Sequence, residues 1–294
     1  MYMCKMSKDM KNLYHNTEEY FNRLRIFKKY MSYCPKEDQQ TSVYETFENF
    51  KLKRDSLRVL AVGAGDGSSD VPIIDILYSK QCHINYIVVE PIMAEVAKFK
   101  SLVASKQEQG QWARVRFEFH QTTIESYLEE SQTRVAEDNF DIILAIHSAY
   151  NMSDPEGVFA GLYERLQKGG LLLNTITAGP LEKLYAKIKE RHPESRQCVG
   201  SASLRRMIQR RLPDIEINTT YKKIAVLADE CFKEESQEGN MLLDFLTQTL
   251  DFRKSVSERV LSDFMELMRE ECCYEKDGKL FLHKDEEDIV IFKK

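Results

Sequence analysis

The sequence predicts an α/β protein built on a doubly wound, mostly parallel β-sheet. Three observations lead to this prediction. Short apolar runs alternate with amphipathic helical segments, a glycine loop follows the first run, and residues 140–146 are almost entirely apolar. A nearly continuous apolar run is typical of a central parallel strand that is covered on both faces. The chain has 294 residues, of which 43% are hydrophobic, and is therefore long enough to bury such a core.

The elements of the sheet follow one another in a regular order. Strands are expected at residues 57–62, 84–90, 115–119, 140–146 and 171–176, and helices near residue 70, from residue 92, and over 123–130 and 154–168. Asp154 is a good N-cap residue, Pro155 suits the first helical position, and Gly169 is placed to end that helix. This β-α-β rhythm predicts a Rossmann-like fold.

The segments on either side of the sheet region are more irregular. Residues 17–33 predict an amphipathic helix with Tyr20, Leu24, Phe27 and Met31 in one stripe. Further helices are expected at 43–50, 181–191, 203–212, 241–250 and 256–268, and one or two strands at 215–227. Residues 280–282 and 288–292 suggest a closing hairpin, with the charged segment 284–288 as its turn.

Charge and hydropathy exclude several classes of protein. The net charge is −5, from 42 basic and 47 acidic side chains, which disfavours a nucleic-acid partner. The one basic cluster, Arg205, Arg206, Arg210 and Arg211, is best explained as the solvated face of a helix. The longest uncharged runs fall short of the roughly 18 residues that a membrane span needs, so no membrane contact is expected.

The cysteines and histidines point to reduced thiols and no metal. The charged segment 1–12 does not resemble a secretory signal, and none of the seven cysteines forms a Cys-x-x-Cys pair. A cytoplasmic protein is therefore expected. No metal-ligand spacing occurs, so the sequence predicts no metal site. Nothing in the sequence requires a dimer, and a monomer is expected.

The loop after the first strand is the most informative segment. Residues 59–67 read Val-Leu-Ala-Val-Gly-Ala-Gly-Asp-Gly, which places glycines at 63, 65 and 67. Glycines at this point let the backbone approach a ligand closely. A dinucleotide site has the spacing G-x-G-x-x-G, whereas here the third glycine comes one residue early. This spacing favours a nucleoside-type ligand, although a tight strand–helix turn alone would also account for the glycines.

A carboxylate ends the second predicted strand. Glu90 lies in Val-Val-Glu-Pro, and a carboxylate at this point can accept hydrogen bonds from both ribose hydroxyls. A capping or surface role is the alternative for Glu90 considered alone. Because Glu90 ends the second predicted strand as the glycine loop ends the first, the two features together favour a nucleoside cofactor.

Together these segments resemble the class I S-adenosylmethionine-dependent methyltransferases. Residues 88–91 and 97–100, the segment Leu-Asp-Phe-Leu-Thr-Gln-Thr at 243–249, and Ile-Val-Ile at 289–291 resemble the histamine N-methyltransferases. The resemblance extends from Tyr20 onward. It implies a helical lid at residues 1–50, a Rossmann-like domain that binds S-adenosyl-L-methionine at 51–180, and a smaller substrate-binding region with closing strands at 181–294.

The resemblance also implies which residues contact the cofactor. Gly63 and its neighbours would pack against its methionine portion, Glu90 would hold the ribose, and Thr122 or Thr123 would flank the adenine. The full cofactor set is Gly63, Ala64, Gly65, Glu90, Pro91, Glu95, Thr122, Thr123 and Ile146. At Glu95 the family has a glutamine, which leaves that contact open, and for Ile146 the alternative is core packing, which is compatible with a ligand contact.

The expected acceptor site departs from the family at several positions. His147 stands where the family has a glutamine, and it could bond an imidazole, accept a proton, or be a satisfied structural histidine. We take it as the candidate catalytic residue because it follows a parallel strand. The other substrate candidates are Tyr20, Leu24, Glu37, Gln40, Tyr150, Leu181, Tyr185, His192, Cys198, Phe245, His283 and Lys284. Either Glu37 or Gln40 would replace the family's amine-binding glutamate.

The chemistry favours a small nitrogen acceptor. An alkylamine of pKa about 10.4 costs roughly 4.6 kcal/mol to deprotonate at pH 7, whereas an imidazole near 6.5 is already mostly neutral. A cation at Lys284 or His283 would suit an acceptor that bears a carboxylate, such as histidine or carnosine. The alternatives are an RNA or protein methyltransferase, or a non-catalytic relative that only binds the cofactor.

Overall fold

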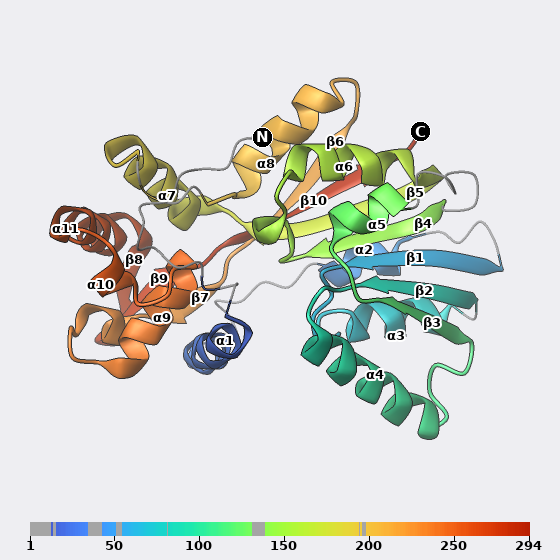
Figure 1. The fold of residues 1–294 in the computed structure, drawn as a ribbon, viewed down its shortest axis with the longest axis horizontal. Helices are drawn as coiled ribbons and strands as arrows, with labels where there is room; N and C mark the ends of the chain where they lie inside the picture. The colour runs from blue at the N-terminus through green and yellow to red at the C-terminus, as the bar shows by residue number, and fades with distance from the viewer. Residues whose placement is uncertain are drawn as a thin grey trace. The chain divides into compact units, whose positions relative to one another are not determined.

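The computed structural model describes residues 13, 16–34, 43–50, 55–80, 82–130, 139–193, 195 and 198–294 (Figure 1). The chain divides into two compact units. Unit 1 comprises Met1–Gln40, Thr177–Gly200 and Tyr221–Glu286, and unit 2 comprises Thr41–Ile176, Ser201–Thr220 and Glu287–Lys294. The roles expected for residues 1–50 as a lid, 51–180 as the cofactor domain and 181–294 as the substrate-binding region stay predictions.

Unit 2 contains the large sheet that the sequence predicts. The seven strands lie in the order β3-β2-β1-β4-β5-β10-β6. They are β1 (Ser56–Val62), β2 (His83–Val89), β3 (Val115–His120), β4 (Phe140–Ile146), β5 (Leu166–Thr177), β6 (Ile217–Lys222) and β10 (Glu286–Phe292). The pairs β1–β2, β1–β4, β2–β3 and β4–β5 are parallel. The predicted doubly wound, Rossmann-like α/β fold is therefore confirmed.

Helices cover both faces of this sheet. They are α2 (Val43–Glu48), α3 (Val71–Ser79), α4 (Met93–Glu108), α5 (Ile124–Glu130), α6 (Pro155–Glu164) and α8 (Ser201–Arg211). Figure 1 shows α3 and α4 on one face and α5, α6 and α8 on the other. Phe99 of α4 and Tyr86 of β2 are fully buried in the core beneath α3 and α4. Helix α6 begins as predicted, because the carboxylate of Asp154 accepts a hydrogen bond from the Gly157 N–H at 3.0 Å.

Unit 1 has a core of its own. Its helices are α1 (Thr17–Met31), α7 (Gly179–Arg191), α9 (Gln237–Thr247), α10 (Phe252–Ser255) and α11 (Glu258–Leu267), with shorter turns at Asp229–Phe232 and Met268–Cys272. A three-stranded antiparallel sheet has the order β7-β9-β8, formed by β7 (Ala225–Leu227), β9 (Lys279–His283) and β8 (Cys273–Lys276). Leu181, Leu242 and Phe264 are buried together in this core.

Helix α1 buries a different stripe from the one that periodicity suggests. The buried residues are Arg23, Ile26, Phe27 and Tyr30, whereas Tyr20 is only partly buried. The shift arises because Nε of Arg23 donates to Oδ2 of Asp244 in α9 at 2.8 Å, within unit 1. A buried ion pair with this geometry fixes the rotation of the helix about its axis.

The predicted closing hairpin is wrong. Strand β9 pairs with β7 and β8, whereas β10 begins at Glu286 and joins the large sheet. Residues 284–288 are buried, at 8% exposure or less, and do not form a solvated turn. The polar partners explain this burial, because the Asp285 carboxylate accepts from the Tyr221 hydroxyl at 2.6 Å and the Ile224 N–H at 3.1 Å.

The described residues contain neither a disulfide nor a cluster of metal-binding side chains. Cys34, Cys82, Cys198, Cys231, Cys272 and Cys273 form no disulfide there. In the same part of the chain, no group of three or more His, Cys, Asp or Glu side chains could hold a metal ion. None of the helices in those ranges has the length and apolar character needed to cross a membrane.

A buried amide in β5 gives a stability prediction. Asn174 is fully buried opposite Ala145 of β4, and neither atom of its amide has a hydrogen-bond partner among the described residues. An unsatisfied buried amide destabilises a fold, so Asn174→Leu should raise the free energy of unfolding by about 1–2 kcal/mol in urea denaturation. The adjacent Thr175→Val is the matched control and should lower it, because Thr175 donates to Asp288 at 2.6 Å. If the Asn174→Leu protein is less stable than wild type, the Asn174 amide is not the destabilising group inferred here.

Candidate active site

The glycine loop presents a bare backbone beside the end of β1. The N–H of Gly63 donates to the Val89 carbonyl at 2.8 Å, and both Gly63 and Gly65 have positive φ angles, of 63° and 57°. A Cβ added to Gly63 would lie 2.6 Å from the Cβ of Ser148. One added to Gly65 would have the Oε2 of Glu95, 4.0 Å away, as its nearest neighbour. Gly63 therefore permits close packing, whereas Gly65 faces open space that a ligand can occupy.

Glu90 is held rigidly at the end of β2. The side chain is 3% exposed, its Oε2 accepts from the Gly65 N–H at 2.9 Å, and its Oε1 accepts from the Ile92 N–H at 2.9 Å. Burial raises the pKa of Glu90 above its usual value, while these two bonds act in the opposite direction. Each oxygen keeps a further lone pair for a hydroxyl donor.

The other predicted cofactor residues lie at the same edge of the sheet, at the carboxyl ends of β1 to β4. Glu95 in the first turn of α4 is 1% exposed, and its Oε1 accepts from Lys98 at 2.6 Å. The hydroxyl of Thr123 accepts from the Ser126 N–H at 3.2 Å at the start of α5, which leaves Thr122 as the better candidate for a ligand contact. Ala64, Pro91 and Ile146 are partly buried there.

His147 lies exposed immediately after β4. Its φ angle is 54°, which is uncommon for a residue with a side chain, and its N–H donates to the Thr175 carbonyl at 2.9 Å. The imidazole stacks on Tyr150, with ring centroids 6.4 Å apart and Nδ1 3.4 Å from the phenol oxygen. A buried structural histidine is therefore a poor description of His147.

Two further residues of the same loop have buried polar atoms; Asn151 stands where the family has a tyrosine, whereas Ser148 was not among the predicted site residues. The hydroxyl of Ser148 is buried against Gly63 and has no hydrogen-bond partner among the described residues. The Oδ1 of Asn151, in the short turn Ala149–Asn151, is also buried without a partner in that part of the chain. For Ser148, its position directly after β4 was the only signal in the sequence.

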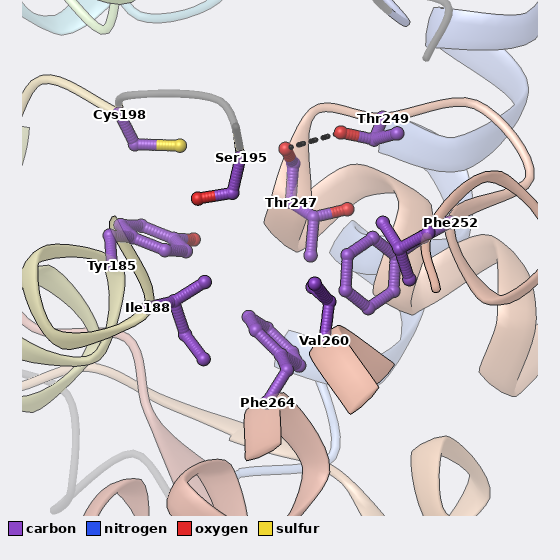
Figure 2. A pocket seen from close by; sticks show the side chains of 10 residues that line it. Tyr185, Ile188, Ser195, Cys198, Thr247, Thr249, Phe252, Val260 and Phe264 are labelled. Atoms are coloured by element: carbon purple, nitrogen blue, oxygen red, sulfur yellow. Dashed lines mark hydrogen bonds between the residues drawn. The ribbon is translucent and has the colours of Figure 1, made fainter. Parts of the chain in front are cut away.

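Unit 1 contains a pocket with two of the predicted substrate residues. Figure 2 shows the side chains that line this small space. The lining residues are Tyr185, Ile188, Ser195, Cys198, Thr247, Thr249, Phe252, Val256, Val260 and Phe264. Tyr185 and Cys198 were predicted to contact the acceptor, whereas the residues of α10 and α11 were not.

The remaining substrate candidates of unit 1 lie outside this lining. Phe245 packs on Tyr20 at 5.8 Å between ring centroids, and Leu24 packs at the edge of the same core. Leu181 is fully buried in that core. Glu37 and Gln40 lie outside the described residues.

Three charged or titratable candidates in unit 1 already have polar or aromatic partners. His192 is buried with Nε2 2.8 Å from Oδ2 of Asp263. His283 packs on the ring of Tyr274, with 4.6 Å between centroids. Lys284 donates to the Thr177 hydroxyl at 2.8 Å and lies 3.6 Å from Glu286, and burial lowers the pKa of its ammonium.

Comparison with known proteins defines the class. The chain belongs to the methyltransferase domain family, whose model matches residues 35–211. Two solved structures share the fold, each with a TM-score of 0.51 and covering 85% of this chain. They are the YcgJ protein from Bacillus subtilis (15% identity, 97% of that chain) and a putative methyltransferase from Bacillus halodurans (13%, 98%). The protein is thus a class I S-adenosylmethionine-dependent methyltransferase.

Among curated proteins the chain is similar to histamine N-methyltransferases, which confirms the predicted resemblance. The enzyme of Danio rerio is 28% identical, with 81% of this chain and 82% of the relative covered. That of Mus musculus is 29% identical, with 80% and 81% covered, and that of Bos taurus is 23% identical, with 97% and 99% covered.

The residues at the glycine loop fit the cofactor. Open space beside Gly65, the rigid carboxylate of Glu90 and the Ser148 hydroxyl, which has no partner among the described residues, together form a polar cradle at the end of the parallel strands. This is the edge at which ligands bind in doubly wound sheets. We expect Glu90 to accept hydrogen bonds from the ribose hydroxyls.

The raised pKa of Glu90 predicts a pH dependence of cofactor binding. Protonation removes acceptor capacity, so affinity for S-adenosylmethionine should fall as the pH drops through the elevated pKa. The variant Glu90→Gln should bind at least tenfold more weakly at pH 7.5 and show little change with pH. Calorimetry between pH 5 and 8 measures both effects. Wild-type binding that is as insensitive to pH as that of Glu90→Gln would refute this role.

Asp70 before α3 predicts a second pH effect, on stability. Burial raises the pKa of Asp70 to about 7, with smaller effects from Asp66 and Glu90, while the hydrogen bond from Tyr86 lowers it. Because the folded state binds the Asp70 proton more tightly than the unfolded state does, the contribution of Asp70 to stability should fall as the pH rises from about 4 to about 7. Relative to wild type, Asp70→Asn should gain roughly 2–4 kcal/mol over this range in denaturation experiments. A difference that stays constant with pH would contradict the prediction.

Proposed function

We propose that this methyltransferase transfers a methyl group to a nitrogen of a small imidazole or amine. The observation that carries the proposal is the exposed, strained His147 at the carboxyl end of β4, next to Ser148, whose side chain packs against Gly63 of the glycine loop. The relatives named histamine N-methyltransferase support the same class of acceptor, since several align over almost the whole chain. The expected cytoplasmic location and monomeric state remain predictions.

The chain's own residues have three tasks in this reaction. Gly63, Gly65 and Glu90 would hold the cofactor, which supplies an electrophilic methyl group on a sulfonium. The protein must then orient the acceptor nitrogen in line with that group and exclude water. We assign His147 to the acceptor side, where its ring, stacked on Tyr150, can bond or deprotonate the acceptor.

An imidazole is the better acceptor on energetic grounds. A neutral imidazole already carries a lone pair at pH 7, whereas a simple amine must first lose a proton at a cost of roughly 4.6 kcal/mol. Methylation of a neutral imidazole at its lone-pair nitrogen gives an imidazolium, and a histidine base next to the acceptor can take the proton from the other ring nitrogen.

An acid-bearing imidazole, such as histidine or carnosine, is the finer version of the proposal. Its support is Lys284, whose ammonium is buried at a cost and would gain from a carboxylate partner. The Oε1 of Glu286 lies 3.6 Å from the Lys284 ammonium and already balances part of its charge, so a substrate carboxylate would compete with Glu286.

An RNA acceptor is less well supported. Of the basic cluster on α8, Arg210 pairs with Glu156 at 3.0 Å and Arg205 lies 3.3 Å from Glu287. These pairs within unit 2 reduce the positive charge that a phosphate backbone would need.

The acceptor assignment is tested with His147→Ala. This change should lower kcat/KM for the acceptor at least tenfold and leave the Kd of S-adenosylmethionine unchanged, because only the acceptor contact is lost. Release of S-adenosylhomocysteine is measured with histamine, histidine, carnosine, simple amines and short RNA. His83→Ala is the matched control, since His83 is an exposed histidine at the amino end of β2, away from the carboxyl ends of the strands. Unchanged acceptor kinetics in His147→Ala would overturn the role of His147, and turnover of RNA alone would overturn the proposed acceptor class.

A further inference from the structure

The loop between β4 and α6, residues 147–154, is held at both of its ends. At the start of the loop, the His147 N–H donates to the Thr175 carbonyl of β5 at 2.9 Å. Near its end, the N–H and the hydroxyl of Ser153 both donate to the Oε1 of Glu125, at 2.8 and 3.0 Å. All of these residues belong to unit 2. The Glu125–Ser153 pair is a clamp that ties the end of this loop to α5.

The clamp joins the two loops to which the cofactor and the acceptor are assigned. Glu125 lies in the first turn of α5, just after the predicted cofactor residues Thr122 and Thr123. Ser153 lies in the loop that begins with His147, the predicted acceptor residue. The two partners are 28 positions apart in the sequence, so the clamp is a tertiary contact. One carboxylate oxygen thereby links the cofactor side of the site to its acceptor side.

The strained backbone at His147 needs such support. Its φ angle of 54° is costly for a residue with a side chain, and such a conformation persists only where surrounding contacts hold it. The His147 ring also stacks on Tyr150 within the loop, so release of the loop end would let both rings move. We propose that Glu125 is a positioning residue for methyl transfer, which acts through Ser153 to hold His147 in place. This inference rests on the proposed function, because it requires an acceptor that binds beside His147.

Loss of the clamp affects the loop rather than the whole fold. Ser153 is exposed and Glu125 is only half-buried, so water can replace their hydrogen bonds. Helix α5 is anchored independently of the clamp, because Ile124, Tyr127 and Leu128 are buried. Surface loops open locally at a much lower free energy than a whole domain unfolds. A variant without the clamp therefore stays folded while its acceptor loop becomes mobile.

Three variants of α5 test the role of Glu125 in turnover. Glu125→Ala should lower kcat about tenfold with histamine or the best acceptor of the panel, and leave the Kd of S-adenosylmethionine unchanged, because only the alignment of the acceptor is lost. Glu125→Gln keeps an oxygen that can accept both bonds and should retain most of kcat. Glu129→Ala is the matched control, since Glu129 is an exposed carboxylate on the same helix. A wild-type kcat in Glu125→Ala, or an equal loss in Glu125→Gln, would overturn the inference.

Hydrogen exchange tests the clamp without turnover. In Glu125→Ala, peptides covering residues 147–153 should exchange severalfold faster than in wild type, whereas peptides from β1 and β2 should be unchanged. Glu125→Gln and Glu129→Ala should match wild type in both regions. Unchanged protection of the loop in Glu125→Ala would show that the clamp does not hold it. Faster exchange throughout unit 2 would show that Glu125 supports the fold as a whole, and would also contradict the inference.

A double-mutant cycle shows whether Glu125 acts through Ser153. Ser153→Ala removes the hydroxyl bond but keeps the N–H bond, so its kcat should fall less than that of Glu125→Ala. Combining the two changes should be no slower than Glu125→Ala alone, because the bonds to Ser153 are already lost. Fully additive losses would refute the connection. Unchanged kinetics in His147→Ala overturn the proposed function, whereas unchanged kinetics in Glu125→Ala alone overturn only this inference.

Discussion

The carboxylate of Glu90 is the interaction on which the rest of the cofactor edge depends. One oxygen binds the N–H of Gly65 and the other binds the N–H of Ile92, each at 2.9 Å. The same side chain thereby fixes the loop after β1 and the turn into α4. Since β1 and β2 are parallel and in register, the two strands deliver these loops to one edge. A ligand that displaced or protonated this carboxylate would loosen both loops at once.

The parts of the fold that periodicity predicted are those whose signals are local. The five core strands, the glycine loop and the cap at Asp154 each depend on a few consecutive residues, and the structure contains all of them. The segment 284–288 shows where local reasoning ends. Its charges suggested a solvated turn, but Tyr221 and Thr177, distant in sequence, supply the hydrogen bonds that allow burial. No window of sequence contains that information.

Some residues of the candidate site could likewise be predicted from sequence position, whereas others are recognised only in the folded structure. Glycine and carboxylate positions followed from their place after strands, because the topology of a parallel sheet fixes where strand ends meet. The burial of the Ser148 hydroxyl depends on its contact with Gly63, and the pocket depends on residues from the helices α7, α9, α10 and α11 of unit 1. Val260 and Phe264 looked like ordinary core positions of an amphipathic helix. Only the assembled unit shows that they border a cavity.

The negative charge around the cofactor edge favours a positively charged sulfonium ligand, as the spacing of the glycines does. Asp66, Asp70, Glu90 and Glu95 cluster around the loop, and their repulsion contributes to the raised pKa values of Asp70 and Glu90. A dinucleotide would bring two phosphates into this field and increase the repulsion, whereas a positively charged sulfonium reduces it. The early third glycine and the acidic surroundings therefore favour the same class of ligand. The glycine spacing acts by allowing the backbone to approach the ligand closely, and the acidic side chains act through charge complementarity.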